Sequence, residues 1–65
     1  MERSEFKKKW TELIDEEHSL IIILLENEYI FIGNAYTIEN EHYVYLYHDD
    51  FLVTVIDLNK IIGLI

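Results

Sequence analysis

The side chains best suited to metal binding or acid–base chemistry are three histidines and thirteen acidic residues. A metal site would have to be drawn from His18, His42 and His48 together with Glu41, Asp49 or Asp50. No pair of histidines has the i,i+4 spacing that places two ligands on one helix face. Since His48, Asp49 and Asp50 are neighbours in a polar stretch, a solvated turn explains them more simply. The sequence predicts no metal and no cofactor.

Paired carboxylates occur at Glu26 and Glu28 and again at Glu39 and Glu41, where they flank predicted turns. A catalytic carboxylate needs a partly buried cleft that shifts its pKa, and the tip of a turn rarely provides one. The chain has no cysteine nucleophile, and its two glycines do not form a phosphate-binding loop. We therefore predict that the protein is not an enzyme.

Four of the five basic residues lie within the first nine positions, and tyrosines alternate along 43–47. Alternate residues of a strand share one face, on which aromatic rings stack with nucleic-acid bases. The candidate nucleic-acid contacts are Arg3, Lys7, Lys8, Lys9, Tyr43 and Tyr45. A net charge of −8 opposes this function, because binding to a phosphate backbone relies on a cationic surface. The acidic body favours a protein partner with a basic surface, which the chain would bind as an acidic mimic or inhibitor; RNA binding is the alternative.

One helix and five strands must position these side chains. Phe6, Trp10, Leu13 and Ile14 recur at helical spacing after Ser4, a suitable N-cap residue, which predicts a helix over residues 4–17. Runs of β-forming residues between polar turns predict strands over 20–25, 29–36, 42–47, 51–56 and 60–65. The polar segment 37–41 is predicted to be a turn. These elements indicate a single mainly β domain over 1–65, in which the sheet bends strongly into a small antiparallel barrel.

The stretch Leu20–Gly33 is apolar on both predicted strand faces, whereas a strand with one buried face should alternate apolar and polar residues. A chain of 65 residues is too small to cover both faces of its own sheet, so we expect another copy or a partner to do so. We predict a homo-oligomeric ring formed through the last two strands. The predicted interface residues are Phe51, Val53, Val55, Ile61, Ile62 and Leu64. Pockets between protomers would make the protein a small-ligand binder, which is a further alternative.

The longest uninterrupted apolar run has six residues, far short of the roughly 20 that span a bilayer. The first ten residues have no apolar core of the kind found in a signal peptide. We expect a cytoplasmic protein without a membrane partner.

The segment Leu25-Glu26-Asn27-Glu28-Tyr29-Ile30-Phe31-Ile32-Gly33 resembles the first sequence signature of the Sm/LSm/Hfq-like family of small β-barrels. Apolar positions at Ala35, Ile38, Val44 and Leu46 and an acid at Glu39 continue the resemblance, which covers about residues 4–65. It implies an Sm-like barrel, close in pattern to SH3-like barrels, that forms rings and binds RNA.

The chain departs from that family at the positions that carry its RNA chemistry. Glu28 stands where the signature has a turn glycine, and the family's RNA-contacting asparagine falls near His42 or Tyr43. The cationic second signature corresponds to Asp57-Leu58-Asn59, which contains no base. The resemblance therefore carries over the fold and the ring, and not the RNA pocket residue by residue.

Overall fold

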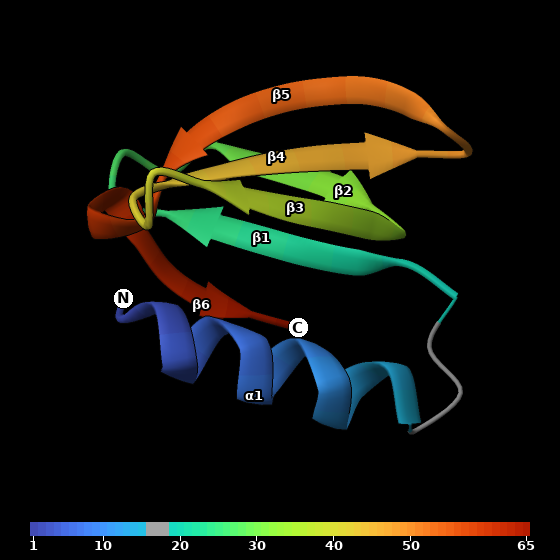
Figure 1. The fold of residues 1–65 in the computed structure, drawn as a ribbon, viewed down its shortest axis with the longest axis horizontal. Helices are drawn as coiled ribbons and strands as arrows, with labels where there is room; N and C mark the ends of the chain where they lie inside the picture. Colours follow the sequence, from blue (N-terminus) through green and yellow to red (C-terminus); the bar gives the residue numbers. More distant parts are fainter. Residues whose placement is uncertain (16–18) are drawn as a thin grey trace.

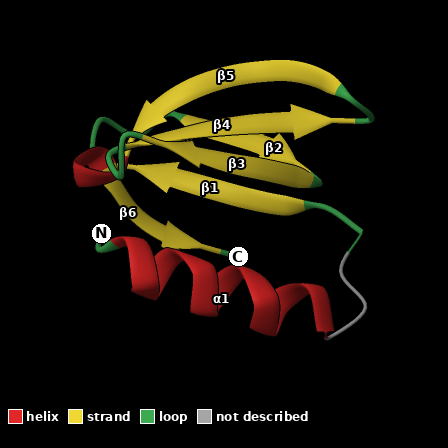
Figure 2. Ribbon diagram, in the orientation of Figure 1, coloured by secondary structure: helices red, strands yellow, loops and turns green. Residues whose placement is uncertain are grey.

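The computed structural model describes residues 1–15 and 19–65 of the chain. Helix α1 (Arg3–Asp15) is followed by β1 (Ile21–Leu25), β2 (Ile30–Gly33), β3 (Ala35–Glu39), β4 (Tyr43–His48), β5 (Phe51–Asp57), the short 3₁₀ helix η1 (Leu58–Lys60) and β6 (Ile61–Leu64) (Figures 1 and 2). The mainly β class with an N-terminal helix is confirmed. The helix begins one residue before the predicted 4–17, and residues 16 and 17 of that prediction lie outside the described residues.

The strands form two antiparallel sheets, each of three strands, in the orders β2-β1-β6 and β3-β4-β5. The prediction of one strand over 29–36 was wrong, because the chain leaves the first sheet after Gly33 and enters the second at Ala35. Gly33 makes this crossing possible: a Cβ there would lie 2.6 Å from both Leu46 Cδ1 and the Tyr47 carbonyl oxygen. The Asn34 backbone N–H donates to the same Tyr47 oxygen at 2.8 Å. The two sheets therefore approach closely at this corner.

The predicted turn over 37–41 was also wrong for its first three residues, since β3 continues to Glu39. Tyr36 pairs with Leu46 and Ile38 with Val44, so apolar contact with β4 extends this polar segment as a strand. The other predicted strands are present with no end shifted by more than one residue.

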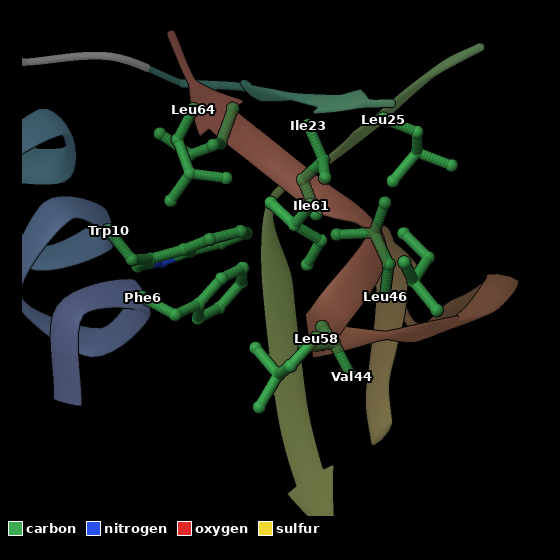
Figure 3. Close-up of a cluster of buried hydrophobic side chains, with 11 residues drawn as sticks. Phe6, Trp10, Ile23, Leu25, Val44, Leu46, Leu58, Ile61 and Leu64 are labelled. Atoms are coloured by element: carbon green, nitrogen blue, oxygen red, sulfur yellow. The ribbon is translucent and has the colours of Figure 1, made fainter. Parts of the chain in front are cut away.

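The core lies between the two sheets and is closed at one end by α1 (Figure 1). The rings of Phe6 and Trp10 point from the helix toward the side chains of the sheets (Figure 3). Their centroids are 5.8 Å apart, and Tyr36 of β3 packs against both rings edge-on at 5.0 and 4.7 Å. The buried residues are Phe6, Trp10, Ile21, Ile23, Leu25, Val44, Leu46, Ile56, Leu58, Ile61 and Leu64. The predicted helix face thus provides the aromatic end of the core, with Leu13 partly buried beside it, whereas Ile14, predicted on the same face, is exposed.

Tight turns place five non-glycine residues in the left-handed region, with φ of 70° at Glu28, 54° at Asn40, 60° at Glu41, 49° at Asp49 and 72° at Asp50. Asparagine and aspartate tolerate this conformation better than other residues with a side chain. Glu28 is less suited to it, which gives a physical reason for the glycine that the Sm-like signature has at this place.

β5 and β6 lie at the outer ends of the two sheets (Figure 1). No backbone pairing joins them to each other within the described part of the chain. Each of these strands therefore has one edge without a partner strand. Within residues 1–15 and 19–65, no helix has the length and apolar character needed to cross a membrane.

Candidate functional site

The free edge of β5 is flanked by apolar side chains that the chain does not bury. Phe51 is 79% exposed, Val53 40% and Val55 44%. Ile56 is the one buried residue of this strand. Val53 is the extra residue of a bulge, because Thr54 pairs with Leu46 and Leu52 pairs with Tyr47. Three of the predicted interface residues therefore lie exposed along this edge.

The free edge of β6 differs from that of β5, because it exposes mainly backbone N–H and C=O groups and few apolar side chains. Ile65, directly after β6, exchanges two hydrogen bonds with Ile22 at 2.8 and 2.9 Å. Backbone groups alternate in direction along an antiparallel strand, so the amide and carbonyl of Leu64 point away from β1. The side chains of Ile61 and Leu64 are 3% and 8% exposed and belong to the core, while Ile62 is 66% exposed. The predicted interface residues of β6 thus offer one side chain and a row of backbone groups.

A second candidate site is a cleft of about 530 Å³ at the N-terminal end of α1. Its walls come from the start of the helix, the β3–β4 turn and η1. The lining side chains with hydrogen-bonding or charged groups are Glu2, Arg3, Ser4, Lys7, Glu41, His42 and Asn59. Across residues 1–15 and 19–65, the ion pairs are His48–Asp49 and Lys60–Glu26, so neither Arg3 nor Lys7 is paired with a carboxylate. The cleft therefore contains two exposed cations, Arg3 and Lys7, together with the exposed carboxylates of Glu2 and Glu41.

The cleft brings together two segments that the sequence comparison with the Sm-like pattern treats separately. That comparison predicts the family's RNA-contacting asparagine near His42 or Tyr43 and its second signature at 57–59, and His42 and Asn59 both line the cleft. The sequence lacks a cation in both regions, and the structure supplies Arg3 and Lys7 from the helix. Local sequence patterns contain no signal for this juxtaposition, because the residues are far apart along the chain.

The other candidate nucleic-acid contacts lie outside this cleft. Lys8 and Lys9 are exposed on α1 and do not line it. Tyr43 stands beside the cleft, since its ring packs edge-on to His42 at 6.5 Å. Tyr45 is farther along β4, on the same outer face of the β3-β4-β5 sheet as Tyr43.

Alternation along β4 places Tyr43, Tyr45 and Tyr47 on the face opposite the buried Val44 and Leu46, as predicted. The acidic residues Glu39 and Asp57 pair with Tyr43 from the two neighbouring strands. Their negative charge opposes a phosphate chain at this end of the ladder.

The histidine and carboxylate pairs lie at exposed turns. His48 Nε2 is 3.5 Å from Asp49 Oδ2, with both side chains largely exposed. Asp49 also accepts a hydrogen bond from the Asn34 amide at 3.0 Å and donates its backbone N–H to Asn34 at 3.1 Å. Of the metal-site candidates, His18 lies outside the described residues. Within the ranges 1–15 and 19–65, no group of three or more histidine, cysteine or acidic side chains has a geometry that could hold a metal ion.

Burial raises the pKa of the Tyr36 phenol above its ordinary value of 10.0, and the positive charge of Arg3 opposes part of that increase. Tyr36 faces the aromatic end of the core, so this shift reflects packing rather than catalysis.

Comparison of the chain with protein-family models, with curated proteins and with solved structures finds no match.

Proposed function

We propose that this protein is a non-enzymatic scaffold that assembles with copies of itself by pairing the β5 edge of one copy with the β6 edge of the next. The observation that carries the proposal is the free edges of β5 and β6, each an outer strand of its sheet; the other two outer strands, β2 and β3, follow one another directly across Asn34. Exposed edges bind other strands readily, and monomeric proteins usually protect them with charge, proline, a β-bulge or a covering element. Among the residues of β5 from Phe51 to Thr54, the chain has no charge and no proline, and the one feature of this kind is the bulge at Val53.

The two edges differ, so their pairing is head-to-tail. Head-to-tail pairing leaves a free β5 edge at one end of the assembly and a free β6 edge at the other. Copies therefore continue to add until the two ends meet and close a ring. In this arrangement the β2-β1-β6 sheet of one copy continues into the β3-β4-β5 sheet of its neighbour. The strongly bent Sm-like or SH3-like barrel is part of the same proposal, since the neighbour's β5 completes the side that a single chain leaves open.

Lysine substitutions at the edges test this assembly. Val53→Lys and Ile62→Lys each place a charge on one edge at a side chain that is already exposed, so the fold of the chain should persist. Thr11→Lys adds the same charge at an exposed position of α1 and serves as the matched control. We expect light scattering coupled to size exclusion to show an oligomer for the wild type and the control, and smaller species for both edge variants. A monomeric wild type at micromolar concentration would refute the proposal.

The cleft at the start of α1 supports a second candidate function, the binding of single-stranded RNA. Its support is the presence of Arg3 and Lys7, both exposed and without a carboxylate partner in the described residues, beside the rings of His42 and Tyr43. Cations position the phosphates, and aromatic rings stack on bases.

A filter-binding titration with a short single-stranded RNA at several salt concentrations tests this second function. If the cleft binds RNA, Arg3→Glu and Lys7→Glu should each abolish a salt-dependent affinity, because they replace a phosphate contact with a like charge. Lys9→Glu makes the same charge change outside the cleft and should retain most of the affinity. Equal losses in all three variants, or no affinity in the wild type, would exclude the cleft as the RNA site.

A further inference from the structure

The outer side of the β2-β1-β6 sheet is an apolar surface that the chain leaves uncovered. Ile21 and Ile23 of β1 point into the core, so Ile22 and Leu24 point outward. Directly opposed residues share a face, which adds Ile32 and Ile30 from β2 and Ile65 after β6. We call this surface the isoleucine face, formed by Ile22, Leu24, Ile30, Ile32 and Ile65, with Gly63 opposite Leu24.

The outer face of the β3-β4-β5 sheet differs from the isoleucine face, because it contains polar and charged side chains. Its outer side contains Thr37, Glu39 and Asp57 around tyrosines whose rings carry hydroxyl groups. The isoleucine face has no polar or charged side chain at any of its paired positions. Ile30 remains 54% exposed, Ile32 42% and Ile65 56%. Contiguous apolar surface of this kind marks an interaction site on a soluble protein.

We propose that the isoleucine face packs against the same face of a second copy of this chain. A partner recognised through charge would bind elsewhere, because the chain has a net charge of −8 and none of that charge lies on this face. The surface that covers it must itself be apolar and uncharged. The isoleucine face of another copy meets this requirement, and a two-fold axis makes any patch complementary to itself.

Such a contact resembles the packing of two sheets in a sandwich, in which inner faces lie about 10 Å apart and side chains interdigitate. At Gly63 the face has no side chain, and a Cβ added there would meet only Leu24 Cδ1, at 3.8 Å, so the second copy can approach the backbone closely at this point. Because the side chains of the isoleucine face are aliphatic and uncharged, the contact requires no hydrogen bond or ion pair between side chains of the two copies.

This contact uses side chains on a sheet face and leaves the edges of β5 and β6 free. It therefore does not depend on the edge pairing proposed above, and the two contacts occur together in one assembly. With both present, two rings stack through their isoleucine faces and the number of copies is even. With the face contact alone, the protein is a dimer.

Native mass spectrometry of single variants separates the two contacts. Ile30→Lys places a charge at the exposed part of the isoleucine face and should halve the mass of the wild-type assembly. Val53→Lys breaks the edge pairing and should leave the dimer formed by the isoleucine face. The combination of both substitutions should give a monomer. Thr37→Lys, at an exposed position on the outer face of the other sheet, is the matched control and should keep the wild-type mass.

A wild type with an odd number of copies, or an Ile30→Lys variant of unchanged mass, would overturn the face contact while leaving the edge pairing intact. A wild-type dimer that Ile30→Lys converts to a monomer would support the face contact and refute the edge pairing. If the wild type floats with neutral phosphatidylcholine vesicles and Ile30→Lys does not, the face binds lipid and the self-contact is wrong. Circular dichroism of Ile30→Lys verifies its fold, and Ile32→Thr, which keeps a β-branched residue on the same face, provides a milder variant with the same expected direction.

Discussion

Replacement of Glu28 by glycine should stabilise the fold, because this residue is in the left-handed region at φ 70°. For a residue with a side chain, that conformation costs roughly 1–2 kcal/mol. Glycine adopts it freely, although the gain in backbone entropy of the unfolded chain offsets roughly 0.5–1 kcal/mol. The expected net stabilisation is about 0.5–1 kcal/mol. For a domain of this size, about 1 kcal/mol raises Tm by roughly 4–8 °C.

The assay is thermal unfolding followed by circular dichroism at one fixed protein concentration, since the Tm of an oligomer depends on concentration. Glu26→Gly is the control, because it removes the same charge from the same turn at a position without positive φ. The control should lower Tm, through backbone entropy and through loss of the exposed ion pair between Glu26 and Lys60 at 3.4 Å. If Glu28→Gly fails to raise Tm, or if both variants raise it equally, backbone strain at Glu28 is not what the substitution relieves.

Three further outcomes test the packing and the titration of the core. Gly33→Ala should destabilise the protein by about 1–3 kcal/mol or prevent folding, because the added Cβ would overlap β4. Gly63→Ala is the control and should fold normally, because the nearest atom to its Cβ would be 3.8 Å away. Denaturant unfolding of the two variants gives the comparison. Asn34→Ala should cost about 1–2 kcal/mol in the same measurement, since it removes the two hydrogen bonds between the Asn34 side chain and Asp49. An unchanged midpoint would mean that these two bonds do not stabilise the corner, which would then depend on Gly33 and on the backbone bond from Asn34 to Tyr47. Because the pKa of the Tyr36 phenol is raised in the folded protein, the unfolded chain releases the phenolic proton at a lower pH, and the free energy of unfolding should decrease as the pH rises above 10. Tyr36→Phe lacks this proton, so its free energy of unfolding should decrease less over the same pH range.

Patterns within a short window of sequence were sufficient for much of this fold. The helical spacing of Phe6 and Trp10 located the face of α1 that the core buries. Alternation along β4 located the tyrosine face, because strand periodicity is a local property. The apolar content of both faces of β1 and β2 indicated that one face is uncovered, which the exposure of Ile30 and Ile32 confirms.

The features that sequence reasoning missed depend on contacts between distant residues. The division of the predicted strand at Asn34 follows from the approach of Gly33 to Leu46 and Tyr47, and a single glycine in a strand does not specify its neighbour. Ile61 and Leu64 were assigned to the interface with Ile62, yet a bulge opposite β1 and the helix direct their side chains into the core. The cleft could not be predicted, since Arg3 and Lys7 meet His42 and Asn59 only after folding.

The most direct test of the central claim is cross-linking between the two edges. The chain has no cysteine, so Val53→Cys and Ile62→Cys each introduce a single reactive thiol, one on each edge. Treated with a short bis-maleimide, a mixture of the two variants should give a covalent dimer that contains one copy of each, and a chain with both substitutions should give a ladder that ends at the ring. Neither variant alone should cross-link to itself. Efficient self-cross-linking of Val53→Cys alone, or no product from the mixture, would contradict head-to-tail pairing of β5 with β6.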